Sequence, residues 1–159
     1  MANRPGKKNP WLILPGEGVG DIRLGMNPDE VNKILDTEPT SSKDFELDRR
    51  FFKIEGFEHA NLEMYYESIA DNWVLNMVNV YVFPVMFLSK FYVTKEGICL
   101  GDHIERALNV FGTPNISDSH PDSSPIAEVY ARYDKQGIAF STDDALIVHV
   151  GIYKSSELT

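Results

Sequence analysis

The stretch Ile22-Arg23-Leu24-Gly25 leads into a helix-like run from Asn27 to Leu35, and the chain repeats nearly the same pattern later. The second copy is Ile98-Cys99-Leu100-Gly101, followed by a helix-like run from His103 to Phe111. Ile98 follows Ile22 by 76 positions, and Gly101 follows Gly25 by the same 76. A Thr and a Pro, a polar segment and several strand-like runs come after each copy. The spacing predicts an internal duplication.

Both helix-like runs carry start signals. Asn27 is a favourable N-cap before Pro28, and Glu30 stands three residues after the cap, as a capping box requires. Asp102 and Glu105 have the same spacing in the second copy, which predicts Asp102 as its N-cap. Each run also places apolar residues on one helical face. These residues are Val31, Ile34 and Leu35, and Ile104, Ala107, Leu108 and Phe111.

Three strands are expected after each helix, and the polar segments 36–46 and 114–126 are expected to be mobile loops. The predicted fold class is α+β, with two tandem strand-helix-β-meander repeats forming one antiparallel sheet and both helices on one face. Residues 1–10 are predicted to be a flexible tail, 11–153 a single domain with repeats at about 16–83 and 92–153, and 154–159 a C-terminal tail. The six strands are expected at about 48–54, 61–67, 74–83, 129–133, 137–141 and 145–153.

Alternation along the longest predicted strands separates a helix-side set from an outward set. The helix-side set comprises Val78, Val80 and Val82, with Leu146, Val148, Val150 and Ile152. The outward set is Met77, Asn79, Tyr81 and Phe83, with Ile147, His149 and Tyr153, joined on the neighbouring strand by Glu63, Tyr65 and Glu67. The outward set is rich in aromatic and hydrogen-bonding groups, which suits either a binding surface or ordinary cross-strand pairs facing water.

The amino-acid composition limits the classes of partner that the chain is expected to bind. The 159 residues carry 15 Lys and Arg against 24 Asp and Glu, a net charge of −9. This charge argues against nucleic acid and membrane surfaces as partners and favours a basic one. The apolar run Trp11–Leu14 is stopped by Pro15-Gly16, too early for a secretory signal, so we expect a cytoplasmic protein.

The sequence contains no convergent set of catalytic residues, so we expect a non-enzymatic protein without a cofactor or metal. The four histidines are scattered, and the single cysteine, Cys99, lies between two apolar residues. Asp118, His120 and Asp122 alternate in a polar segment, where a surface loop is favoured over a metal site. The glycine-rich run 15–20 departs from the dinucleotide pattern and carries Glu17, which would repel a pyrophosphate.

The repeated Ile-x-Leu-Gly phrase, the helix of the Pro-Asp-Glu-Val-x-x-Ile-Leu kind and the meander that ends on a Val- and Ile-rich strand resemble the tandem repeats of the β-lactamase inhibitor protein. They also resemble the single-copy repeat in the small lipoprotein of the outer-membrane barrel-assembly machine. The resemblance covers about residues 16–153. It implies a non-enzymatic binder that grips its partner with an open, aromatic-lined sheet face.

These observations lead to one functional hypothesis and one alternative. The hypothesis is a protein-binding module, of the inhibitor or immunity type, that holds a partner with a basic surface on the open sheet face. The alternative is a small-ligand-binding protein or an enzyme with its site in the concavity between the repeats. The predicted binding residues are Glu63, Tyr65, Asn79, Tyr81, His149 and Tyr153.

Overall fold

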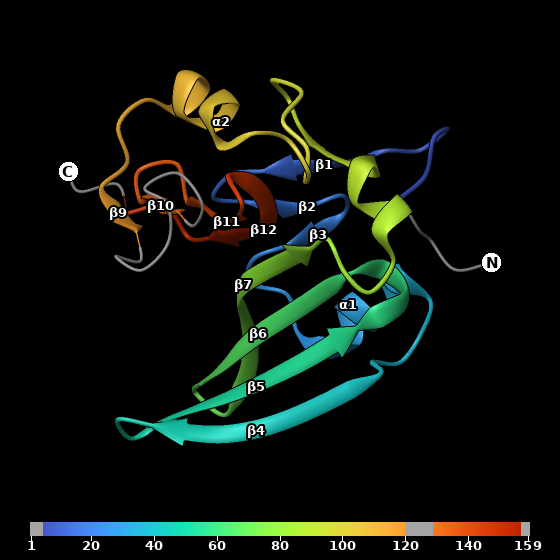
Figure 1. The fold of residues 1–159 in the computed structure, drawn as a ribbon. Helices are drawn as coiled ribbons and strands as arrows, with labels where there is room; N and C mark the ends of the chain where they lie inside the picture. Colours follow the sequence, from blue (N-terminus) through green and yellow to red (C-terminus); the bar gives the residue numbers. More distant parts are fainter. Residues whose placement is uncertain (1–4, 120–128, 157–159) are drawn as a thin grey trace.

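The part of the chain that the structure describes forms two β-sheets with few helices, an α+β arrangement (Figure 1). The structure, a computed structural model, describes residues 5–119 and 129–156. The larger sheet has eight strands in the order β4-β5-β6-β7-β12-β11-β10-β9, and all neighbours are antiparallel. Its strands are β4 (Ser41–Leu47), β5 (Arg50–Phe57), β6 (Leu62–Ile69), β7 (Asn72–Tyr81), β9 (Ile116–Ser119), β10 (Val129–Tyr133), β11 (Ile138–Asp143) and β12 (Leu146–Tyr153).

A second sheet of four strands, in the order β3-β2-β1-β8, was not predicted. Its strands are β1 (Trp11–Leu14), β2 (Gly18–Val19), β3 (Ile22–Arg23) and β8 (Tyr92–Thr94), and β1 pairs with β8 in parallel. The prediction of a single antiparallel sheet is therefore wrong. Short strands separated by about eighty residues leave no local signal of their pairing. The aromatic rings of Trp11 and Tyr92 meet edge to face across that parallel pair, with centroids 6.2 Å apart.

Two short α-helices, α1 (Pro28–Leu35) and α2 (Ile104–Phe111), follow the repeated tetrapeptides. The capping box of α1 is confirmed: Asn27 Oδ1 accepts from the Glu30 N–H at 2.9 Å, and Glu30 Oε1 accepts from the Asn27 N–H at 3.4 Å. The predicted cap of α2 is wrong by one residue, because His103 is the N-cap. Asp102 instead accepts from the Cys99 N–H and pairs with Arg106, each at 2.8 Å. The 3₁₀ turns are η1 (Glu58–Ala60) and η2 (Met86–Phe91).

Three hairpins of the large sheet use the same tight turn. Strand residues flank two central residues that both have positive φ, at 48–49, 70–71 and 144–145. Two-residue turns of this kind match the right-handed twist of the strands they join. They fix the register of β4 with β5, β6 with β7, and β11 with β12.

A β-bulge interrupts the register in each half of the sheet. One lies at Tyr65/Tyr66 between β6 and β7, and the other at Ser141/Thr142 between β11 and β12. Each bulge moves the following residues to the opposite face. The predicted face is consequently wrong beyond the second bulge, because Ile147 is fully buried while Leu146 is 44% exposed. On β7 the first bulge places Leu75 on the inner face, opposite Tyr66, where it is buried.

One hydrophobic core joins the helices, the small sheet and the inner face of the large sheet. Most of the expected core residues belong to it; Ile34, Val82, Leu108 and Phe111 are partly buried at its edge. Val148 is only half-buried, since the bulge places Ile147 in the core instead. The expected core residues that are fully or almost fully buried are Val31, Leu35, Val78, Val80, Ile104, Val150 and Ile152.

The segment 36–46 is not the loop that its polar composition predicted, because β4 begins at Ser41. This strand is exposed along most of its length, and its pairing with β5 stabilises it despite weak strand propensity. Phe45 stacks on Phe52 across the pair, with centroids 5.2 Å apart. Part of the segment 114–126 forms β9, and residues 120–126 lie outside the described residues.

The two repeated glycines make equivalent backbone contacts. The Gly25 N–H donates to Leu75 O and the Leu75 N–H donates to Met26 O, both at 2.8 Å. In the same way, the Gly101 N–H donates to Ile147 O at 2.7 Å and the Ile147 N–H donates to Asp102 O at 2.9 Å. Gly25 and Gly101 have φ of 96° and 88°, which side-chain-bearing residues rarely adopt. Each glycine thus ties the segment before a helix to a long strand.

Candidate functional site

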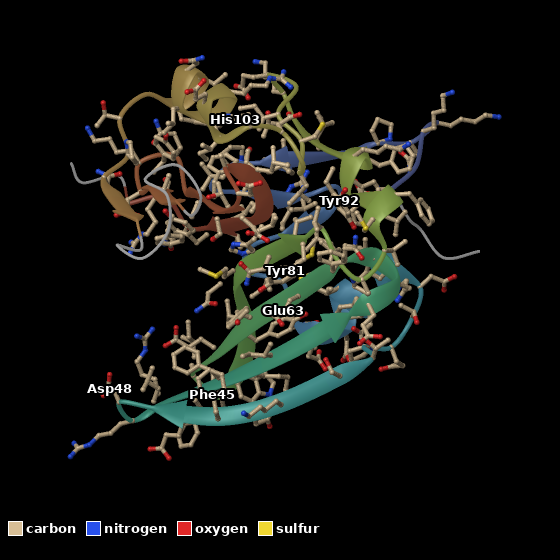
Figure 2. The ribbon with its side chains drawn as sticks, in the orientation of Figure 1. Phe45, Asp48, Glu63, Tyr81, Tyr92 and His103 are labelled. Atoms are coloured by element: carbon tan, nitrogen blue, oxygen red, sulfur yellow. The ribbon has the colours of Figure 1, made fainter. Side chains whose placement is uncertain are left out.

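Five of the six predicted binding residues lie together on one side of the large sheet. We call this side, which faces away from the hydrophobic core, the open face. In Figure 1, α1 lies behind β5 and β6, and no helix covers the side of β4–β7 turned to the viewer. Figure 2 shows Tyr81 and Glu63 close together on this side. The five residues, which we call the open-face cluster, are Glu63, Tyr65, Asn79, Tyr81 and His149.

Strand register explains why these residues meet. Tyr81 stands opposite His149 on the β7–β12 pair, and Asn79 stands opposite Glu63 on the β6–β7 pair. Tyr65, two positions after Glu63, lies on the same face of β6. β12 begins at Leu146, 65 positions after β7 ends at Tyr81, yet the two strands are adjacent in the sheet. The cluster therefore unites the two halves of the chain.

The imidazole of His149 is held on both sides. Its Nε2 lies 2.6 Å from Asn79 Oδ1, and its Nδ1 lies 3.0 Å from Ser141 Oγ. Because an amide oxygen only accepts, Nε2 carries the proton in the neutral ring, and the Ser141 hydroxyl donates to Nδ1. Burial lowers the pKa of His149 from 6.5 to about 4. The ring is therefore neutral at physiological pH.

Asn79 is only 3% exposed although it lies on the open face. It faces Gly151 across β7 and β12, and a Cβ added at Gly151 would lie 3.1 Å from Asn79 Oδ1 and 3.5 Å from His149 Cε1. The glycine thus leaves room for the amide and the imidazole to meet. Asn79 was predicted to contact a partner, but its geometry makes it a positioning residue for His149.

Tyr81 and Tyr65 flank the carboxylate of Glu63. The Tyr81 hydroxyl donates to Glu63 Oε1 at 3.1 Å. Burial, followed by the negative charge of Glu63, raises the pKa of Tyr65 to about 12, and the same two causes raise the pKa of Tyr81. Both phenols therefore keep their protons at neutral pH and act as hydrogen-bond donors.

Tyr153, the sixth predicted residue, lies on the same face but outside the cluster. Its hydroxyl donates to Asp134 Oδ1 at 2.9 Å, and the guanidinium of Arg132 lies 5.8 Å from its ring centroid. Arg132 also pairs with Asp134 at 2.9 Å. Burial and the hydrogen bond to Asp134 raise the pKa of Tyr153 to about 12. These three residues form a second, smaller group near the end of β12.

Sequence reasoning missed several residues of the open face. Ser141 was not identified because its role depends on the register of β11 with β12, although its alternation with Ala139 placed it on this face. Phe45 was missed because β4 was expected to be a loop, and its stacking on Phe52 of β5 was missed with it. Figure 2 shows Phe45 beside β4, the edge strand, and Tyr81 further inside the sheet, on β7. The aromatic surface is thus longer than predicted.

The order Ser141, His149, Asn79 has the hydrogen-bonding pattern of a hydroxyl activated by a base. A general base works best when its pKa lies near the operating pH, and burial holds the pKa of His149 at about 4. The imidazole is then a weak base towards the hydroxyl. The geometry instead suits a rigid brace that fixes the ring of His149 beside Tyr81.

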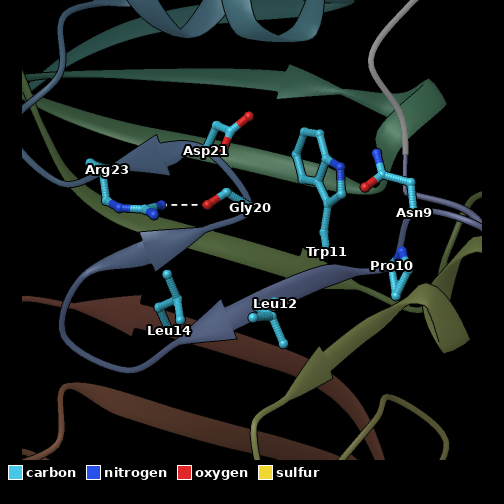
Figure 3. Close-up of a pocket in the computed structure, with 8 residues that line it drawn as sticks. All are labelled: Asn9, Pro10, Trp11, Leu12, Leu14, Gly20, Asp21 and Arg23. Atoms are coloured by element: carbon cyan, nitrogen blue, oxygen red, sulfur yellow. Dashed lines mark hydrogen bonds between the residues drawn. The ribbon is translucent and has the colours of Figure 1, made fainter.

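The glycine-rich run 15–20 forms the turns that connect β1, β2 and β3, beside a hollow of about 300 Å³ (Figure 3). The Gly20 N–H donates to Leu12 O at 2.9 Å, and the Gly16 N–H donates to Gly137 O at 3.1 Å. The guanidinium of Arg23 donates to Gly20 O, as Figure 3 shows. These amides are used by the backbone, so they do not form the cradle of free N–H groups that binds phosphate.

The candidate site has no metal-binding group within the described residues. No group of three or more His, Cys, Asp or Glu is arranged to hold a metal ion within residues 5–119 and 129–156. His120 and Asp122, considered above with Asp118, lie outside that range. None of the helices in the same range is long and apolar enough to cross a membrane.

Comparisons with known proteins give a fold and no activity. No family model matches the sequence, and no curated protein matches it. The structure is similar to that of the uncharacterized protein YfeY from Escherichia coli, with a TM-score of 0.55 and 10% identity over 89% of this chain and 99% of the other. It is also similar to a DUF4309 family protein, YjgB from Bacillus subtilis, with a TM-score of 0.51 and 14% identity over 88% of both chains. The three proteins share a fold.

Proposed function

We propose that this chain is a non-enzymatic protein-binding module of the inhibitor or immunity type. The partner would dock on the open face and contact Tyr65, Tyr81, His149 and Tyr153. The observation that carries this proposal is the connected cluster of half-buried aromatic and hydrogen-bonding side chains on a helix-free sheet face. Aromatic residues bury a large area with few rotatable bonds, and a few such anchors often dominate an interface.

The internal bracing of the cluster supports a binding role. Asn79 and Ser141 hold the His149 ring, and Glu63 holds the Tyr81 hydroxyl, so these side chains have little conformational entropy left to lose on association. Pre-organised anchors raise affinity by reducing this entropic cost.

Charge supports a partner with a basic surface. The net charge is −9, and Glu63 contributes a carboxylate in the middle of the aromatic cluster. Long-range attraction of this kind speeds the approach of a cationic partner and weakens as salt is added. The cytoplasmic location expected from the sequence belongs to the same proposal.

We also propose that the fold arose by tandem duplication, with both helices on the inner face, in the manner of the β-lactamase inhibitor protein. The equivalent hydrogen bonds of Gly25 and Gly101 support this idea. So do the bulges at matching places in the β6–β7 and β11–β12 hairpins, and the matching tight turns. The cluster then lies at the junction of two equivalent units.

Affinity capture from the organism that encodes the chain tests the proposal. The wild type is compared with a Tyr81→Ala, Tyr153→Ala double variant and with Phe87→Ala, a control that removes an aromatic side chain 65% exposed on η2. A stoichiometric protein partner should be retained by wild type and control and lost by the double variant, while all three unfold cooperatively. Equal retention by all three would rule out the open face as the binding surface.

A further inference from the structure

The inner side of the sheet carries a second site, separate from the open face. A cavity of about 680 Å³ lies between the start of α1, the residue Glu38 beyond its end, β5 and the β6–β7 turn. Five carboxylates line it, against one ammonium, that of Lys53. Lys53 pairs with Asp44 at 2.8 Å, and its positive charge also favours the ionised form of Glu55. One ammonium still leaves the lining strongly acidic. The carboxylates are those of Asp29, Glu30, Glu38, Glu55 and Asp71.

One of these carboxylates is buried and incompletely partnered. Glu55 is only 7% exposed, and its Oε1 has no hydrogen-bond partner within the described part of the chain. The other side of the carboxyl is hydrogen-bonded to Ser42, its neighbour across β4 and β5. An orphan carboxylate oxygen facing a cavity is costly unless a ligand completes it.

A second polar atom of the cavity lining lacks a partner in the same way. Asn32 lines the cavity, and its Oδ1 has no hydrogen-bond partner among the described residues. Both oxygens, Glu55 Oε1 and Asn32 Oδ1, can accept a hydrogen bond. A primary ammonium has three donors and no acceptor, so its needs match this set.

We propose that this cavity binds a linear aliphatic polyamine, with one ammonium held by Glu55 and Asn32. The remaining carboxylates come from separate segments of the chain, as a ligand with several spaced charges requires. The indole of Trp73, which also lines the cavity, offers an apolar surface to the methylene groups. A compact metal ion fits less well, because the described residues contain no convergent group of three such ligands.

The burial of Glu55 affects the pKa of its carboxyl and predicts how ligand binding depends on pH. Desolvation raises the pKa of this carboxyl. A bound ammonium favours the ionised form and would lower that pKa again, so binding should strengthen as the pH rises through the range in which Glu55 ionises. The site lies on the opposite side of the sheet from the open-face cluster and does not depend on the proposed function.

Isothermal titration calorimetry of the whole chain with spermidine at low salt tests the site. We expect saturable one-to-one binding that weakens at least tenfold in Glu55→Gln. The matched control is Glu105→Gln, which makes the same charge change on the exposed surface of α2 and should leave the affinity unchanged. Thermal unfolding of each variant checks its fold. If Glu55→Gln fails to fold, Glu38→Gln, an exposed lining residue, should still weaken binding severalfold.

Three results would overturn the proposal. The first is the absence of saturable heat with spermidine. The second is an equal loss of affinity in the variant and in the α2 control, which would indicate general attraction to an acidic protein. The third is full competition by magnesium chloride at matched ionic strength, which would assign the cavity to unspecific counterions.

Discussion

The ring of His149 stacks on the ring of Tyr81 across strands β12 and β7, with centroids 4.9 Å apart and planes inclined by 29°. This contact joins two strands from opposite halves of the chain. A hydrogen bond to Glu63 holds the Tyr81 ring, and hydrogen bonds to Asn79 and Ser141 hold the His149 ring. It is the centre of the open-face cluster. Any partner that docks there meets a surface that is already ordered.

The buried imidazole makes the stability depend on pH. Because the folded pKa of His149 is about 4 and its ordinary value is 6.5, the unfolded chain takes up this proton first as the pH falls. The neutral His149 therefore contributes to the free energy of unfolding in full above about pH 6.5. This contribution, up to about 3 kcal/mol, is lost progressively as the pH falls towards 4. Urea unfolding at about pH 7.5 and 4.5 should show a smaller pH effect in His149→Gln than in wild type. The same pH effect in both proteins would contradict the buried, neutral imidazole.

The bulge on β12 predicts that truncating Ile147 destabilises the fold more than truncating Leu146, the reverse of what strict alternation predicts. Ile147→Ala should lower the free energy of unfolding by about 2–4 kcal/mol, because Ile147 is fully buried. Leu146→Ala, the adjacent control, should cost less than about 1 kcal/mol, because Leu146 is 44% exposed. Chemical denaturation of the two variants measures the difference. Uninterrupted alternation would require the reverse order.

The repeated glycines should respond alike to substitution. Gly25→Ala and Gly101→Ala each force a side chain into a positive-φ backbone, at a cost of about 1–2 kcal/mol. Apart from the glycine itself and its two chain neighbours, no described residue has an atom within 4 Å of a Cβ placed at either position, so backbone strain should set the cost. Equal unfolding penalties would support equivalent roles in the two halves, whereas a penalty at only one glycine would count against them.

Local signals carried the correct predictions, and long-range contacts account for most of the errors. The cap of α1 depends only on Asn27 and Glu30, which lie three positions apart, so the sequence alone was sufficient to predict it. The pairing of β1 with β8 and the bulge at Ser141 depend on segments that meet only in the folded chain. Strict alternation of side chains along β12 places Ile147 on the outward face, whereas the bulge places it in the core.

The candidate site shows the same difference between what local sequence signals predict and what long-range contacts decide. Alternation along single strands was enough to place Glu63, Tyr65, Tyr81 and His149 on one face. The burial of Asn79 was not foreseeable, because it depends on Gly151 in the neighbouring strand. The contact of Ser141 with His149 required the register of a strand pair, which no single strand reveals.

Salt should act on the rate of association with the captured partner. Wild-type association should slow by about tenfold or more between low and high salt, since screening weakens steering of a basic surface. Glu63→Gln should have a lower rate at low salt and a shallower salt dependence. Stopped-flow or surface-plasmon measurements provide both rates. A rate that does not change with salt would argue against a basic partner.

Site-specific photo-cross-linking in the native cell tests the central claim most directly. A photoreactive phenylalanine is placed at Tyr65 on the open face and, as a control, at Phe87 on η2. The account predicts one dominant protein adduct from position 65 and none of that adduct from position 87. The same adduct from position 87, with none from position 65, would show that the partner binds elsewhere and would contradict the proposed role of the open face.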